Sequence, residues 1–178
     1  MSGVISSLSR VVDSVEESFP VEYDLDGLKG LLYRAAAEEV QAYYQYILPA
    51  KFLVGPLRPD IEKEFVENAK DELDDHFDKI LTRLSQLGAD VTPIDSLDKL
   101  AGVAVGKYIV PEAPYDVSKL LMDNIEAEKE AIQTYRLLCG FTKEFDPVTH
   151  KMAKEILSDE EEHLSDLQDL LADVSSLK

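Results

Sequence analysis

Residues 156–164, Ile-Leu-Ser-Asp-Glu-Glu-Glu-His-Leu, combine the spacing of a helix with two polar side chains on its apolar face. Residues three and four apart share a face of an α-helix, so the apolar line through Ile156 and Leu164 also carries Glu160 and His163. A buried lone carboxylate costs several kcal/mol unless a partner compensates its charge. Glu-x-x-His facing the inside of a helical bundle is an arrangement that binds metal ions. One such pair also fits a simple hydrogen bond, so a metal site requires matching ligands elsewhere.

Composition predicts a single compact unit that avoids anionic partners. The chain has 178 residues, 45% of them hydrophobic, and a formal net charge of −18 from 36 acids and 18 bases. This charge repels phosphate backbones and anionic lipid, so neither nucleic acid nor membrane is an expected partner. The chain has no long uncharged apolar run and no signal-peptide pattern, and Cys139 is its only cysteine. We expect a cytoplasmic protein without an internal disulfide.

Residues 1–20 are predicted to form an amphipathic helix outside the main domain, which we place at residues 21–178. Apolar residues recur at helical spacing on one face and Pro20 ends the pattern. The polar face has one arginine and no lysine, which disfavours both a membrane-surface helix and direct DNA binding. We expect this helix to pack on the bundle or on a neighbouring subunit, and a docking tag for a larger assembly is the alternative.

Four long helices are predicted in the main domain. They are expected at residues 26–54, 59–88, 116–141 and 146–175. Asp26 and Asp116 are expected N-caps, Gly88 is a C-cap glycine, and Pro49 should kink the first helix. Residues 88–116 are rich in proline and glycine and include a possible short helix at residues 96–105. A connection of this length fits the long crossover between the two hairpins of a ferritin-like bundle.

Each of the other three long helices also carries an acid inside its apolar stripe. The first has Glu39, whereas Glu38 falls on a polar face and serves as a solvated control. The second has Glu72 and His76, which are four residues apart rather than three but still share a face. The third has Glu128. Residues assigned to polar faces are Asn68, Lys70, Asp71, Asp74, Asp75 and Asp78 on the second helix, and Glu126 and Glu130 on the third.

Together the four helices provide a complete dimetal ligand set. The set is Glu39, Glu72, His76, Glu128, Glu160 and His163. Di-iron and di-manganese carboxylate bundles use one Glu from each of two helices and a Glu/His pair from each of the other two. The charges of four carboxylates balance those of two divalent cations. We therefore expect the site to be electrically neutral with metal bound, and the burial of its uncompensated charges to be prohibitively costly without metal. A ligand set of carboxylates with a few imidazoles suits iron or manganese. The sequence has no inward cysteines at ligand spacing, which argues against a structural zinc cluster.

Several motifs resemble the Dps-like mini-ferritins, a branch of the ferritin-like superfamily with a bacterioferritin-type di-iron site. They are Ala35–Tyr44, Asp75-His76-Phe77, Ile125–Glu128 and Glu160–His163, in the same order along the chain. The resemblance implies an all-α ferritin-like four-helix bundle that assembles as a homo-oligomer, a dodecameric hollow cage. It also implies a ferroxidase that oxidises Fe(II) with hydrogen peroxide or oxygen and stores ferric iron. The cysteine pair often found near the metal site in this family is absent here.

Expectations for individual roles follow from the ligand set and from the helical spacing. Two iron ions are expected as cofactors, with manganese or zinc possible in the purified protein. Glu72 and Glu160 would bridge the two ions and the other four residues would each bind one ion. Three tyrosines near the glutamates are expected to be packing residues rather than ligands: Tyr43, Tyr46 and Tyr135. His150 is expected to be a surface or interface residue rather than a ligand.

Other functions remain open on sequence alone. A manganese catalase or a di-iron or di-manganese peroxidase uses the same ligands, and a non-enzymatic structural or cargo protein would bind metal without turnover. A rubrerythrin-like peroxidase would need a cysteine-rich iron domain, which this sequence lacks. No haem is expected, although a haem-binding bacterioferritin could use Met122 or Met152 at a subunit interface.

Overall fold

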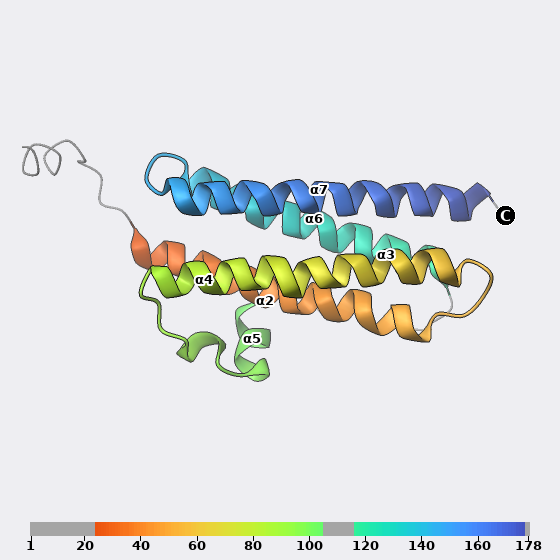
Figure 1. The fold of residues 1–178 in the computed structure, drawn as a ribbon, viewed down its shortest axis with the longest axis horizontal. Helices are drawn as coiled ribbons and strands as arrows, with labels where there is room; N and C mark the ends of the chain where they lie inside the picture. Colours follow the sequence, from red (N-terminus) through yellow and green to blue (C-terminus); the bar gives the residue numbers. More distant parts are fainter. Residues whose placement is uncertain (1–23, 105–115, 177–178) are drawn as a thin grey trace, which may run out of the picture.

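The computed structural model describes residues 24–104 and 116–176, and every regular element in these ranges is a helix. Two helical hairpins lie side by side (Figure 1). In the first hairpin, α2 (Leu25–Phe52) packs along α3 (Arg58–Lys70), the π-helical segment η1 (Asp71–Phe77) and α4 (Asp78–Gln86), which follow one another directly. In the second, α6 (Val117–Thr142) packs along α7 (Pro147–Ser176). The all-α four-helix bundle predicted from sequence is therefore confirmed.

Aspartates cap three of the long helices. The predicted cap Asp26 is wrong, because α2 is capped by Asp24, whose Oδ1 accepts a hydrogen bond from the Gly27 N–H at 2.8 Å. Asp26 lies instead in the first turn, where the helix dipole favours an acid. Asp116 caps α6 as predicted, accepting from the Lys119 N–H at 3.0 Å. Asp146 accepts from the Thr149 N–H at 2.9 Å at the start of α7.

A long connection joins the two hairpins. It starts at Gly88, whose φ of +62° lets the Gly88 and Ala89 N–H groups bond back to the carbonyls of Ser85 and Leu84, each at 3.0 Å. It continues through the short 3₁₀ helix η2 (Thr92–Ile94) and α5 (Leu97–Val103), close to the predicted short helix. α5 lies against α2, and α4 ends at the opposite end of the bundle from the start of α6 (Figure 1). The described ends of the connection, residues 88–104 and the start of α6, are placed as the expected crossover requires.

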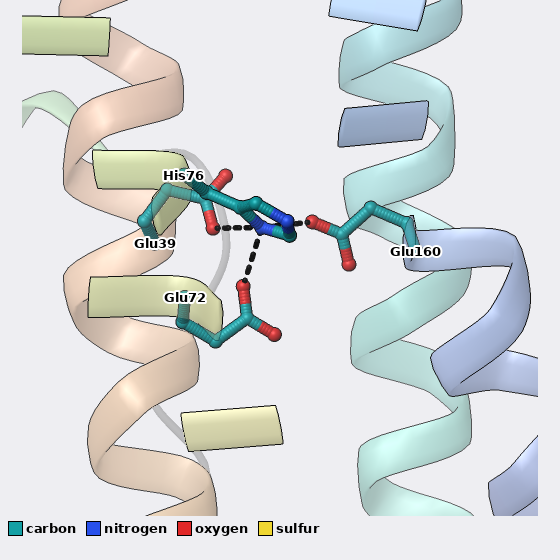
Figure 2. Close-up of side chains that lie close together, drawn as sticks. All are labelled: Glu39, Glu72, His76 and Glu160. Carbon is teal, nitrogen blue, oxygen red and sulfur yellow. Dashed lines mark hydrogen bonds and ion pairs between the residues drawn. The ribbon is translucent and has the colours of Figure 1, made fainter. Parts of the chain in front are cut away.

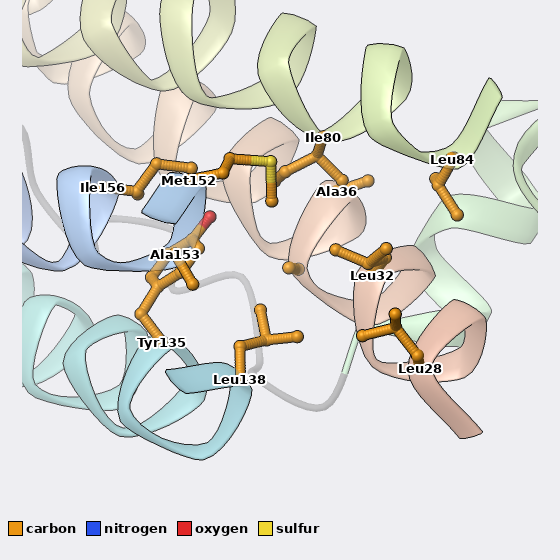
Figure 3. Close-up of a cluster of buried hydrophobic side chains, with 11 residues drawn as sticks. Leu28, Leu32, Ala36, Ile80, Leu84, Tyr135, Leu138, Met152, Ala153 and Ile156 are labelled. Carbon is orange, nitrogen blue, oxygen red and sulfur yellow. The ribbon is translucent and has the colours of Figure 1, made fainter. Parts of the chain in front are cut away.

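The bundle has two apolar clusters with a polar band between them. One cluster, drawn in Figure 3, is built from the early part of α2, from α4, and from the α6–α7 corner. The other is built from the later part of α2, from α3, and from the opposite ends of α6 and α7. On α2, Glu39 falls between Ala36 of the first cluster and Tyr46 of the second. The two clusters thus keep the intervening acids and imidazoles away from bulk water.

Three expectations about individual positions need comment. The prediction that Asn68 lies on a polar face is wrong: it is only 2% exposed, because it lies one turn before Glu72 on the inner face. Glu38, predicted to face solvent, has a side chain that is only 15% exposed, because it pairs with Arg34 at 2.8 Å and accepts from the Thr134 hydroxyl at 2.8 Å. α2 continues through Pro49 to its end at Phe52. The N-terminal helix and the domain boundary after residue 20 lie outside the described residues and stay predictions.

Candidate metal centre

The six predicted ligands meet in the polar band. Their donor atoms form two groups, each with all atoms within 4.8 Å of one another. Glu39 and His76 belong to one group, Glu128 and His163 to the other, and both groups share the two remaining carboxylates, Glu72 and Glu160. Figure 2 shows the first group, in which the side chains of α2, η1 and α7 converge on one point. This arrangement has the form of two ion positions joined by two bridging carboxylates.

Distances around the imidazoles fit a shared ion better than ordinary hydrogen bonds. His76 Nδ1 lies 3.2 Å from oxygens of Glu72 and Glu160 and 3.5 Å from Glu39. One ring nitrogen can donate a single proton, yet this atom faces three carboxylates. Donor atoms about 2.1 Å from one ion lie roughly 3.0–3.4 Å from each other in octahedral or tetrahedral geometry. His163 Nδ1 has similar neighbours, Glu72 at 3.4 Å and Glu160 at 3.7 Å.

Several of these buried atoms have no hydrogen-bond partner. Among the described residues they include Glu72 Oε1, both carboxylate oxygens of Glu160, and His163 Nδ1. Leaving a buried charged or polar atom unsatisfied costs about 1–3 kcal/mol or more. Three of these four atoms belong to Glu72 and Glu160, the carboxylates that both ligand groups share. The fourth belongs to the His163 imidazole of the second group. The residues present therefore fit a pair of divalent cations.

The π-helical segment accounts for the unusual spacing on the second helix. Glu160 and His163 are three residues apart on the α-helix α7, whereas Glu72 and His76 are four apart within η1. Hydrogen bonds in a π-helix run from residue i to i+5, so each turn is wider than an α-helical turn. The wider turn accommodates the additional residue and leaves both side chains 0% exposed on the inner face. The sequence indicated the extra residue but not the helix type.

Two tyrosines form a reciprocal pair of hydrogen bonds that the sequence analysis missed. Tyr46 of α2 donates to Glu128 of α6, and Tyr135 of α6 donates to Glu39 of α2. Both hydroxyls are buried, and burial raises the pKa of both phenols well above the usual value, so they remain donors. The signal was the equal spacing of seven residues in Glu39…Tyr46 and Glu128…Tyr135. Tyr43, by contrast, is partly exposed.

The outer nitrogens of the two imidazoles also have reciprocal partners. His76 Nε2 lies 3.4 Å from Asp159 Oδ2, and His163 Nε2 lies 3.5 Å from Asp71 Oδ2. Each aspartate immediately precedes the glutamate of the opposite Glu/His pair. A carboxylate on the outer nitrogen directs the other nitrogen toward the metal and fixes the ring orientation. The polar assignment of Asp71 is correct, and its carboxylate reaches back to the site.

The surroundings of the cluster shift the pKa of several of its side chains. Burial raises the pKa of Glu39 and of Glu128 well above the usual value, and neighbouring carboxylates add to the rise. Burial would also raise the pKa of Glu72, but the adjacent imidazoles outweigh it and lower that pKa. Burial would lower the pKa of each histidine, yet the surrounding carboxylates raise that of His163 to about 11 and that of His76 further. These directions are what four carboxylates sharing one buried site are expected to show when they take up protons in the absence of metal.

Other residues singled out from sequence lie away from the cluster. His150 is partly buried near the α6–α7 corner, with Nδ1 3.0 Å from the Cys139 carbonyl oxygen. Cys139 packs beside the apolar cluster of Figure 3, and Met152 is part of that cluster. Met122 is exposed on α6. No described helix combines the length and apolar character needed to cross a bilayer.

Comparison with known proteins agrees with this geometry. A model of the ferritin-like domain matches residues 29–177. The DNA protection during starvation protein of Pyrococcus furiosus is 32% identical over 148 residues, 83% of this chain and 78% of that protein. A dodecameric thioferritin of Bacteroides fragilis is 36% identical with a TM-score of 0.82, covering 88% of this chain and 90% of that one. Dps of Thermosynechococcus elongatus, at 18% identity and a TM-score of 0.76, covers 82% and 90% and shares the fold. The chain belongs to the ferritin-like domain family.

Proposed function

We propose that the chain is a ferroxidase subunit that binds two iron ions, oxidises Fe(II) and stores the ferric product. The observation that supports this most directly is the pair of ligand groups sharing Glu72 and Glu160. Glu39 and His76 would hold one ion, Glu128 and His163 the other, and the two shared carboxylates would bridge them. Family membership supports iron storage and protection against oxidative stress in general.

The ligand set also suits the stoichiometry of the reaction. Two Fe(II) ions supply the two electrons that reduce one hydrogen peroxide, with two protons, to two water molecules. The carboxylates and imidazoles would hold both ions next to one oxidant molecule. Asp71 and Asp159 would keep the imidazole rings oriented, and the tyrosine hydroxyls would keep Glu39 and Glu128 in place.

We also propose assembly into a hollow homo-oligomeric cage of twelve subunits. The support comes from the Bacteroides fragilis relative, a dodecameric thioferritin. A row of apolar side chains at i, i+4 and i+8 on α2, Tyr44, Leu48 and Phe52, is 39–65% exposed. Exposed apolar rows of this kind favour subunit contacts.

Protection of DNA would follow from the removal of iron and peroxide. The Pyrococcus furiosus relative is a DNA protection during starvation protein. A net charge of −18 disfavours direct contact between this chain and a phosphate backbone. We therefore propose that the chain protects DNA by acting on Fe(II) and the oxidant rather than by binding the DNA.

Anaerobic Fe(II) titration followed by addition of peroxide tests the proposal. We expect two Fe(II) per chain and ferric absorbance after one peroxide per pair, with a native mass of twelve chains. His163→Ala or Glu128→Ala should lose at least one of the two ions and reduce oxidation to background. Glu161→Ala is the matched control, because Glu161 is exposed and forms an ion pair with Arg136 at 2.7 Å on the surface of the bundle.

Three outcomes would contradict the proposal. Equal loss in His163→Ala and Glu161→Ala would mean that the cluster is not the oxidation site. A preparation that binds only zinc and remains monomeric would exclude the storage function. Tight manganese binding with oxygen evolution from peroxide would instead indicate a catalase.

A further inference from the structure

A cavity of about 390 Å³ lies between α2 and α6, which run in opposite directions in the bundle (Figure 1). Its lining includes Glu39 and Glu128, together with Tyr46 and Tyr135, which hydrogen-bond to them. The cavity therefore reaches the carboxylates of both ligand groups. It approaches them from the α2–α6 side of the bundle.

Two alanines at matching positions create this space. Ala42 lies three residues after Glu39 and four before Tyr46, and Ala131 has the same spacing from Glu128 and Tyr135. The two tyrosine–glutamate bonds cross between the helices on either side of these alanines, so Ala42 and Ala131 stand at the same level. Both alanines line the cavity. Larger side chains at this level would fill the gap.

The lining of the cavity suits a divalent cation. Besides the two cluster glutamates it includes Glu38, Glu126 and Glu130, and none of the residues that line it is Lys, Arg or His. Asn124 also lines the cavity, is 2% exposed, and its Oδ1 has no hydrogen-bond partner among the described residues. Carboxylate and amide oxygens are preferred ligands of hard divalent ions. Arg34 pairs with Glu38 at 2.8 Å and Lys129 with Glu126 at 2.7 Å, so the attraction for a cation rests mainly on Glu130 and on the cluster itself.

The opposite side of the cluster is closed by the imidazoles. Each ring points Nδ1 toward the bridging carboxylates and Nε2 toward an outer aspartate, Asp159 for His76 and Asp71 for His163. These aspartates are 42% and 56% exposed, whereas His76 is fully buried and His163 nearly so. An ion arriving from that side would have to displace a ring from its partner.

We propose that the α2–α6 cavity is the passage by which divalent cations reach the cluster, with Asn124 Oδ1 as a ligand on the way. This rests on the proposed metal-binding function and names the route that it uses. The proposal predicts a defect in the rate of metal uptake that is separate from the final amount bound.

Uptake of Co²⁺ by the assembled, metal-free protein, followed by stopped-flow absorbance, tests the route. Ala131→Leu should slow uptake on the order of tenfold or more while leaving the final Co²⁺ stoichiometry unchanged, because closing the cleft removes its focusing effect. Ala172→Leu is the matched control, since it adds the same side chain at an exposed position of α7. Asn124→Ala should also slow uptake without filling the cavity.

A second variant keeps the test decisive if Ala131→Leu does not fold. Glu126→Gln with Glu130→Gln changes two exposed residues, and uptake should be slower and less sensitive to salt than in the wild type. Wild-type rates in the Leu and the Gln variants would overturn the passage. A wild-type protein that binds no Co²⁺ would instead overturn the proposed function, so the two failures are distinguishable.

Discussion

At the scale of single residues, the two halves of the bundle hold each other's glutamates. Tyr46 donates to Glu128, and Tyr135 donates to Glu39. In the metal-free protein these bonds satisfy oxygens of carboxylates whose pKa is raised by burial. A neutral phenol is a suitable donor there because it adds no charge to the cluster. The bonds also join α2 to α6 across the cavity between them.

We predict that Tyr46→Phe and Tyr135→Phe each lower the free energy of unfolding of the metal-free protein by about 1–3 kcal/mol, because a buried carboxylate loses its donor. The loss should be smaller with metal bound, since the ion then satisfies the same carboxylate. Denaturant unfolding with and without Co²⁺ measures both values. Tyr44→Phe is the control, because Tyr44 is exposed. An equal loss with and without metal would assign the tyrosines a packing role only.

At the scale of elements, the π-helical segment η1 allows Glu72 and His76, four residues apart, to occupy the same kind of site as Glu160 and His163, which are three residues apart on α7. Glu72 and His76 are both buried, whereas Asp74 between them is exposed. Removing one residue from a π-helical turn should restore a regular α-helix without rotating the flanking segments out of phase. Removing one residue from a regular α-helix instead rotates everything on one side by about 100°.

We therefore predict that deletion of Asp74 gives a folded protein with a Glu-x-x-His pair, a melting temperature no lower than that of the wild type, and retained Co²⁺ binding. Deletion of Lys63 from α3 is the control. It should turn Ile61 out of the core relative to Phe65 and cost about 2–5 kcal/mol, comparable to truncating a large core side chain. Thermal melts of both variants decide the matter, and equal destabilisation would mean that the π-helical turn is required by its surroundings.

At the scale of the whole molecule, charge in the polar band connects stability to pH and metal. The pKa of His163 is about 11 in the folded protein, against an ordinary value of about 6.5. A raised pKa contributes stability that is complete below about pH 6.5 and is lost as the pH rises toward 11. The raised pKa values of Glu39 and Glu128 act in the same direction, beginning above about pH 4.5. The lowered pKa of Glu72 contributes stability that is complete above about pH 4.5, so it does not change the free energy of unfolding at higher pH.

We predict that the melting temperature of the metal-free protein falls between pH 6.5 and pH 9, while the gain on adding Mn²⁺ or Co²⁺ increases. Metal binding must displace the protons on the imidazoles and on the raised carboxylates, so it is weaker at lower pH. At a hundredfold excess over Kd the gain is about 2.7 kcal/mol. Thermal melts across this pH range measure both trends.

The control for this prediction is the double variant Glu128→Ala with Glu160→Ala. It removes one terminal and one shared carboxylate and should lose most of the response to metal. Its melting temperature without metal serves as the baseline for that response, because the change also removes the acceptor of Tyr46 and a carboxylate partner of both imidazoles. A wild type indifferent to metal, or a double variant that responds equally, would mean that these glutamates bind no metal pair.

The sequence alone determined the helices, their order and the six inward polar residues, because helical periodicity and the desolvation cost of a carboxylate are local properties. Glu160 and His163 could be assigned to the core from their neighbours three and four residues away. Tertiary structure decided what depends on contacts between helices. Examples are the crossed tyrosine bonds, the aspartates behind the imidazoles, the burial of Asn68 and the partial burial of Glu38. It also decided the protonation of the cluster, since a pKa is set by every charge within a few Å, and those charges come from four different helices.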